Sequence, residues 1–150
     1  MSEHPFTLDQ IRYQAQDQAL AFLLASIVYF KEQGCSPLPF IASVGNTLAP
    51  RWKDLQGFGA HVVMEHLALH VVALGGHIVA MTGDDVLSCA TLSHIPSTEI
   101  LKSFALSRDD ADVIWDVFQP IAASLYLWYA WSREQDEVTF KLSRTRLPIV

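Results

Sequence analysis

Charged residues are scarce in this sequence, and basic residues are the scarcest. Only 17% of the 150 residues are charged, against about 25% in an average soluble domain. Ten lysines and arginines stand against sixteen aspartates and glutamates, which gives a net charge of −6. A nucleic-acid-binding surface needs a basic face that contacts the phosphates. We therefore expect no nucleic-acid partner.

Cysteine is nearly absent, and the glycines form no phosphate-binding motif. Cys35 and Cys89 are the only cysteines, which excludes a disulfide scaffold and a CxxC metal site. The spacing of the seven glycines matches neither the Walker loop of nucleotide-binding proteins nor the glycine motif of dinucleotide-binding domains. The segment Met1–Pro5 has no basic start followed by an apolar stretch, so we expect no secretory signal and a cytoplasmic protein with reduced thiols.

Long hydrophobic runs are also missing, although 51% of the residues are hydrophobic and the mean hydropathy is +0.23. A membrane-spanning helix needs about 20 apolar residues in a row. The purest runs, Ala19–Phe30 and Ile121–Trp131, are shorter, so we expect no membrane contact. The apolar residues instead predict one domain over residues 1–150. They exceed what one core of this size hides, which predicts a homodimer.

Three helices are expected in the first half of the chain. Thr7 and Gln10 form a capping box for a helix that starts polar, ends buried and stops near Gly34. Residues 37–48 follow as a second helix that starts with proline. The third helix, about Phe58–Leu74, is apolar on nearly every side. Such a helix belongs in the middle of a structure.

The second half is expected to contain a small sheet. His77–Thr82 and Val86–Ile95 are rich in β-forming residues and predict a hairpin. Apolar and polar residues alternate over Val138–Leu142, which is typical of a half-buried strand. We predict an α+β fold, a helix-rich single domain with a three-stranded antiparallel sheet that has Val86–Ile95 in its middle.

A long helix is expected between the hairpin and the last strand. Ser107 and Asp110 resemble a capping box at its start. Pro120 is expected to kink this helix without ending it, because apolar sequence with helical spacing resumes at once and continues to Trp131.

Several local sequences also carry a family resemblance. They are Gly45 before Leu48, Leu74-Gly75-Gly76, His94-Ile95-Pro96-Ser97, Glu99-Ile100-Leu101-Lys102, Leu106-Ser107-Arg108-Asp109 and Val138-Thr139-Phe140. Together, and in this order of elements, they resemble the L-2-amino-thiazoline-4-carboxylic acid hydrolase-like family and the related small-molecule-binding 4-vinyl reductase domain. The resemblance spans most of the chain and implies an α+β ligand-binding fold.

The sequence departs from these families at their cysteines. Family members often have cysteine before the proline that follows the hairpin, where this chain has Ile95, and again in the last strand, where it has Val138 and Thr139. Because both thiols are missing, the resemblance implies the fold and not the thiolate or metal chemistry.

Histidines gather on the third helix and beside it. His66 and His70 are four residues apart, so they project from one helical face and are candidate ligands of one metal ion. A catalytic zinc or iron site needs a third ligand from elsewhere. With a turn at Gly83-Asp84, His77 lies opposite about Ala90 and roughly 13 Å along the strand from His94, which makes the two histidines poor direct partners. The alternative is that the helical histidines bond to each other or to backbone carbonyls in the core.

Glu65 is the only charged residue between Asp54 and Asp84. Burying a carboxylate is costly unless it is paired, protonated or facing a cavity. We therefore consider Glu65 the polar anchor of a ligand pocket, or a general base with a raised pKa, oriented by His61 one turn earlier. The alternative is a structural hydrogen bond to His61 or a solvent-facing position.

Aromatic residues are dense near the end of the predicted long helix. Trp128 and Trp131 share one helical face, Tyr126 and Tyr129 share another, and Trp115 precedes them on the same helix. Aromatic residues at this spacing are usually core residues. Some of these are expected to line an apolar pocket or a subunit interface.

Three functions remain open. The leading one is a homodimeric small-molecule-binding domain with an apolar, aromatic-lined pocket between the central helix and the long kinked helix. The side chains expected to line that pocket are Glu65, His61, Trp115, Tyr126 and Trp128. A hydrolase acting on a carbon–nitrogen bond is the alternative, with Glu65 or a metal ion at His66 and His70 activating water. The third is a protein–protein assembly module. No residue identifies a cofactor.

Overall fold

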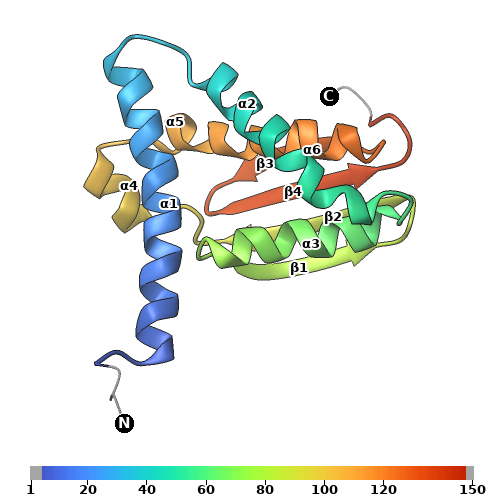
Figure 1. Ribbon diagram of the computed structural model, residues 1–150, viewed down its shortest axis with the longest axis horizontal. Helices are drawn as coiled ribbons and strands as arrows, with labels where there is room; N and C mark the ends of the chain where they lie inside the picture. The colour runs from blue at the N-terminus through green and yellow to red at the C-terminus, as the bar shows by residue number, and fades with distance from the viewer. Residues whose placement is uncertain (1–4, 148–150) are drawn as a thin grey trace.

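The computed structural model describes residues 5–147 and has an α+β fold (Figure 1). The elements follow one another as α1 (Leu8–Glu32), α2 (Leu38–Leu48), the 3-10 helix η1 (Ala49–Leu55), α3 (Ala60–Ala73), β1 (His77–Gly83), β2 (Leu87–Ser93), α4 (Thr98–Phe104), α5 (Arg108–Asp112), the 3-10 helix η2 (Val113–Val117), α6 (Phe118–Ser124), β3 (Trp128–Glu134) and β4 (Glu137–Ser143). No helix among these residues is long and apolar enough to span a membrane.

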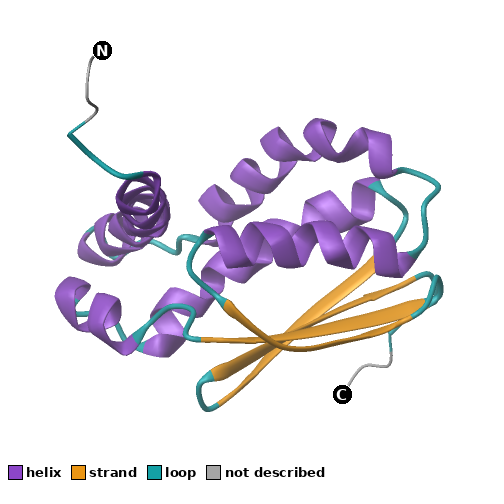
Figure 2. Ribbon diagram, turned by 90° about the horizontal axis from the view of Figure 1, so that it is seen from below, coloured by secondary structure: helices purple, strands orange, loops and turns teal. Residues whose placement is uncertain are grey.

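The sheet is antiparallel and has four strands in the order β1-β2-β4-β3. β2 lies between the hairpin strand β1 and the last strand β4, which confirms that part of the predicted topology. The helices lie over one face of the sheet, and no described segment covers the other face (Figure 2). The fourth strand was not predicted.

β3 replaces the end of the predicted long helix. That helix was expected to reach Trp131, but α6 ends at Ser124 and Tyr126 takes a positive φ of 60°. The chain then becomes extended, because tryptophan and tyrosine favour strands where a neighbouring strand can pair with them. That neighbour is β4, which a two-residue turn joins to β3. One residue of the turn, Gln135, has a φ of 55°. Pro120 lies in the first turn of α6, where its missing amide does no harm, so it does not kink a longer helix.

The core lies between the sheet and the helices α3 and α6. Val63, Met64 and Leu67 of α3 are buried, which confirms its central position. Trp115 and Phe118 both contact the ring of Phe140 on β4, with ring centroids 5.3 and 6.0 Å apart. These rings pack together in the core of the domain.

α1 lies at one side of the molecule (Figure 1). Its predicted capping box is confirmed, because the Gln10 amide donates to the Thr7 hydroxyl and the Thr7 amide donates to the Gln10 side chain. One face of its second half packs on the rest of the protein through Leu20, Leu24 and Ile27. The expectation that the helix ends buried is therefore confirmed for this face alone. The opposite face remains exposed to solvent.

Candidate functional site

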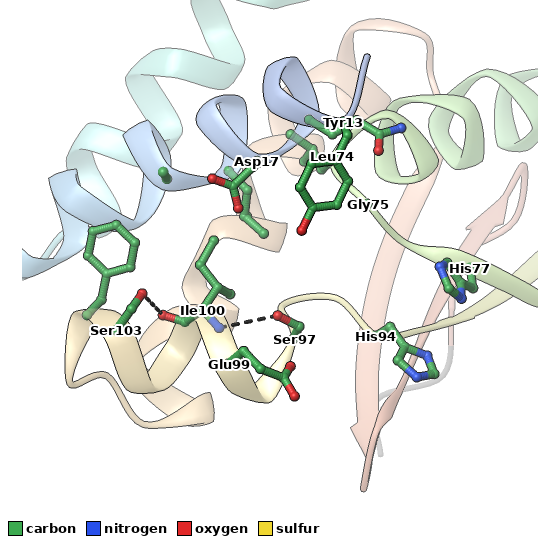
Figure 3. Close-up of a pocket in the computed structure, with 14 residues that line it drawn as sticks. Tyr13, Asp17, Leu74, Gly75, His77, His94, Ser97, Glu99, Ile100 and Ser103 are labelled. Carbon is green, nitrogen blue, oxygen red and sulfur yellow. Dashed lines mark hydrogen bonds between the residues drawn. The ribbon is translucent and has the colours of Figure 1, made fainter. Parts of the chain in front are cut away.

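A cleft of about 690 Å³ lies between α1, α4, the end of α3 and the open end of the β1–β2 hairpin (Figure 3). Tyr13 and Asp17 point into it from α1, and Glu99 lies at its edge on α4. His77 and His94 close it on the hairpin side. The cleft therefore joins segments that are far apart in the sequence.

The charges around the cleft have one sign. Asp17 and Glu99 contribute two carboxylates, and neither forms an ion pair with another residue in the range 5–147. No lysine or arginine is among the residues that line the cleft. Carboxylates gathered in a concave site raise the local concentration of cations.

The inner wall of the cleft is apolar. It consists of Leu20 and Ala21 of α1, Leu74 at the end of α3, and Ile100 and Phe104 of α4. A ligand in this cleft would contact hydrocarbon on one side and carboxylates on the other. Ligand sites commonly combine an apolar lining with a few polar groups that fix orientation.

The two histidines at the hairpin end lie against each other. The ring centroids of His77 and His94 are 4.9 Å apart and the rings are tilted by 30°. His94 has a positive φ of 60°, and its Nδ1 lies 2.9 Å from the Ser93 hydroxyl and 3.8 Å from Oδ2 of Asp136.

The prediction that these histidines lie far apart is wrong. It assumed a tight turn at Gly83-Asp84. In the structure Gly83 pairs with Ser88, so the loop that joins this pair is four residues long. Within this loop, Oδ1 of Asp84 accepts hydrogen bonds from the amides of Val86 and Leu87. The register also shifts between Ile78 and Ala80. His77 consequently pairs with Ser93 instead of Ala90.

The predicted metal pair lies elsewhere, on α3. The rings of His66 and His70 are 4.8 Å apart, and both pack on Trp52 of η1. The Nδ1–H of His70 donates to the carbonyl oxygen of His66 at 2.9 Å. Burial lowers the pKa of His66 below its usual range, and the neighbouring His70 lowers it further. Within residues 5–147 no group of three His, Cys, Asp or Glu side chains is placed to hold a metal ion.

Glu65 is not a buried carboxylate. Its side chain is 57% exposed on the outer face of α3, and its Oε1 lies 3.3 Å from Nε2 of His61. On its other side, Nδ1 of His61 lies 3.0 Å from the Ser88 hydroxyl. This agrees with the structural alternative for Glu65, a bond to His61 at a solvent-facing position.

The chain of Ser88, His61 and Glu65 resembles a catalytic triad in composition only. The Ser88 hydroxyl is fully buried and donates its proton to the carbonyl oxygen of Thr82 at 3.2 Å. The Nδ1–H of His61 then donates to Ser88, so the imidazole does not act as a base toward that hydroxyl. These bonds anchor α3 to the hairpin.

The predicted aromatic residues are spread over the molecule. Trp115 is buried in the core, with its indole N–H donating to Asp112 at 3.0 Å. Tyr126 is exposed after α6, and Trp128 is exposed on β3, where Arg146 lies over its ring. In the strand it is Tyr129 and Trp131 that share a face toward the helices.

None of the five predicted ligand-binding residues is among those that line the cleft. The residues found there were missed because local patterns explained them. Glu99 stands in the first turn of the short helix α4, where an acidic residue is ordinary, and Asp17 stands in the polar first half of α1. The only sequence feature that suggests the contact between His77 and His94 is that both residues are histidines.

Comparison with protein-family models finds no matching family, and comparison with curated proteins finds no matching relative. The resemblance to the thiazoline-carboxylate hydrolase-like and 4-vinyl reductase families therefore stays a prediction.

Proposed function

We propose that the protein is a small-molecule-binding domain and that its ligand is an organic cation with an apolar portion, bound in the cleft between α1 and α4. The observation that carries the proposal is the presence of two carboxylates, Asp17 and Glu99, among the lining residues of a cleft that has no lysine or arginine. The volume of about 690 Å³ lies within the usual range for small-molecule sites, roughly 300–1,000 Å³.

Each side of the cleft has a role in this proposal. The carboxylates of Asp17 and Glu99 accept hydrogen bonds from an ammonium or guanidinium group, and such charge-assisted bonds are the strong ones. The ring of Tyr13 offers an aromatic face to the same positive charge. Leu74 and Phe104 contact the apolar portion of the ligand and keep water from it.

Two probes of the same shape and opposite charge test the proposal. 2-Phenylethylammonium carries the expected cation on an aromatic group, and 3-phenylpropanoate carries a carboxylate on the same group. We expect calorimetry and amide chemical shifts to show binding of the cation alone, with shifts around the cleft. Equal binding of both probes, or preference for the anion, would overturn the proposal.

Charge-neutralising variants locate the site. Asp17→Asn is expected to weaken binding of the cation by about 1.5–3 kcal/mol, the usual contribution of a hydrogen bond to a charged group. Asp9→Asn is the matched control, because it removes the same charge from an exposed position of α1 outside the cleft. Equal losses in both variants would show that the cation responds to net charge and not to the cleft.

The proposal includes a homodimer. Its support is the number of large apolar side chains that one copy of the chain leaves in solvent. They are Phe6, Leu8, Ile11, Tyr13, Phe22, Tyr29, Leu38, Phe58, Val62, Leu69, Ile78, Val79, Val86, Leu87, Tyr126 and Trp128. Exposed apolar surface on this scale is typical of proteins that associate. A concentration-independent mass near 16.7 kDa in light scattering would contradict the dimer.

A further inference from the structure

α1 has two apolar faces, and only one of them is covered. Leu20, Leu24 and Ile27 pack on the rest of the protein. A second set of residues runs the length of the helix, and every member of it is exposed. We call this set the outer stripe; it consists of Leu8, Ile11, Ala15, Gln18, Phe22, Ala25 and Tyr29.

The outer stripe has the spacing of a coiled-coil seam. Its members are separated alternately by three and four residues, which is the a/d pattern of heptads, continued over three heptads. At about 100° per residue, the mean direction of the stripe lies roughly 175° from that of Leu20, Leu24 and Ile27. The stripe therefore faces directly away from the body of the protein.

We propose that a second copy of this chain docks on the outer stripe, with α1 against the partner's α1 in a two-stranded coiled coil. The inference rests on the homodimer of the proposed function and gives that dimer its interface. Leu8, Ile11, Phe22 and Tyr29 are 52–79% exposed in one copy. They become the buried knobs of the pair.

Charge favours a second copy as the partner. The positions that flank the seam are Thr7, Arg12, Gln14, Ala19, Ala21, Ser26 and Val28. Only Arg12 among them is charged. Two copies therefore meet without a run of like charges across the seam, although each copy has a net charge of −6. An acidic or basic partner helix would find nothing complementary there.

Gln18 gives the pair a register. It is the single polar residue of the outer stripe, near its middle. A polar residue at one core position of a coiled coil is satisfied only when it meets a polar partner, so it fixes the alignment. In a symmetric pair, Gln18 meets the same residue of the other copy at the two-fold axis, and the two side-chain amides bond to each other.

The surface beside the stripe is shaped for an incoming helix. A hollow of about 560 Å³ is lined by residues that include Phe6, Ile11 and Gln18, and a second of about 430 Å³ by residues that include Phe22 and Tyr29. Side chains of the partner fill these hollows in the way that knobs fill holes. Figure 2 shows α1 nearly along its axis, at the edge of the molecule.

Sedimentation equilibrium at 10–100 µM tests the interface. We expect the unaltered protein to have twice the mass of 16.7 kDa and Ile11→Glu/Phe22→Glu to have the single mass. Both residues are exposed, so the far-UV circular dichroism of the variant should match that of the unaltered protein. Val62→Glu/Leu69→Glu is the matched control, because it places the same two charges on exposed apolar residues of α3. It should remain a dimer.

Cross-linking provides a second measurement. In a Cys35→Ser background, which removes the exposed native cysteine, Gln18→Cys should form a disulfide-linked dimer on mild oxidation. Asp9→Cys, at an exposed position of α1 that lies outside the stripe and lines neither hollow, should not. Absence of the Gln18→Cys dimer, or equal cross-linking at both positions, would overturn the inference.

The outcomes separate the inference from the proposed function. A monomeric unaltered protein overturns the homodimer and its interface together and leaves the cation site standing. A dimer that survives Ile11→Glu/Phe22→Glu overturns only the interface. A dimer that dissociates in this variant, in a protein that binds no cation, supports the interface and overturns the ligand proposal. The two sites are separable at Asp17, which lines the cleft and neither hollow, whereas Tyr13 lines both the cleft and the hollow beside Ile11.

Discussion

Arg133 of β3 donates two hydrogen bonds to the carboxylate of Asp112, from Nε to Oδ2 at 2.6 Å and from Nη2 to Oδ1 at 2.8 Å. Asp112 is buried, and its Oδ1 also accepts the indole N–H of Trp115 at 3.0 Å. Nη2 of Arg133 also donates to the carbonyl oxygen of Ile95 at 2.7 Å. One ion pair therefore ties α5, β3 and the loop after β2 together at the end of the sheet next to the cleft.

Loss of one partner of this ion pair should be costly. Asp112→Ala leaves the guanidinium of Arg133 buried without its counter-ion, and breaking such a pair destabilises by about 3–5 kcal/mol. We expect a loss of this size in the free energy of unfolding from urea titrations. Asp109→Ala, at an exposed position of the same helix, should change it by less than about 1 kcal/mol. A similar small change for Asp112→Ala would show that water replaces the carboxylate at low cost.

Gly45 should also be intolerant of change, for a steric reason. A Cβ at this position would lie 2.4 Å from the carbonyl oxygen of Val117 and 2.5 Å from Cγ of Pro120. Neither a carbonyl nor a proline ring moves aside easily, so α2 must shift. We expect Gly45→Ala to destabilise by at least about 1–3 kcal/mol, the usual cost of overpacking.

The control for this variant is Asn46→Ala, an exposed position of α2 where alanine is the better helix former. Thermal unfolding should show a lower Tm for Gly45→Ala and an unchanged or higher Tm for Asn46→Ala. Equal Tm values for the two variants would contradict the close contact between α2 and α6.

The sequence predicts most of the fold where local patterns decide it. The order of β1, β2 and β4 follows from alternation over residues 138–142 and from the hairpin pattern, and the capping box at Thr7 fixes the start of α1. β3 was missed because residues 121–131 are apolar at both the helical and the strand period. The choice between them is made by Glu137–Ser143, which offers β3 a partner across a tight turn.

The candidate site was harder to predict for the same reason. Asp17 and Glu99 belong to helices that meet only in the tertiary structure, and each has an ordinary local role. The predicted register between β1 and β2 was wrong by three residues, which placed His77 and His94 too far apart. The longer loop and the bulge between Ile78 and Ala80 account for the difference. Glu65 was assigned to a cavity because its neighbours are apolar, although one narrow face of α3 reaches solvent.

The position of Glu65 leads to a prediction about its replacement. Glu65→Gln removes a charge that is more than half exposed and lies 3.3 Å from Nε2 of His61. Exposed pairs of this kind contribute about 0–1 kcal/mol, so the free energy of unfolding should change by no more than that. Binding of the cation probe should be unchanged, because Glu65 does not line the cleft. A loss of binding as large as that of Asp17→Asn would move the ligand site to α3.

His66 should make the stability of the protein fall on acidification. Its pKa in the folded state is lowered from about 6.5, first by burial and then by His70. Below pH 6.5 the unfolded chain therefore binds a proton at this position while the folded chain does not, and the free energy of unfolding decreases as the pH falls toward the folded-state pKa. Above pH 6.5 the imidazole is neutral in both states and contributes no such slope.

His66→Phe tests this pH dependence, since it keeps an aromatic ring against Trp52 and removes the titrating group. Between pH 7.5 and 5.5, we expect the Tm of the unaltered protein to fall more steeply than that of His66→Phe. His77→Phe, which removes an exposed imidazole, controls for the loss of a histidine as such. If the slopes of the unaltered protein and His66→Phe coincide, His66 takes up its proton equally in the folded and unfolded states. The contacts with Trp52 and His70 then leave its charged form accessible to water.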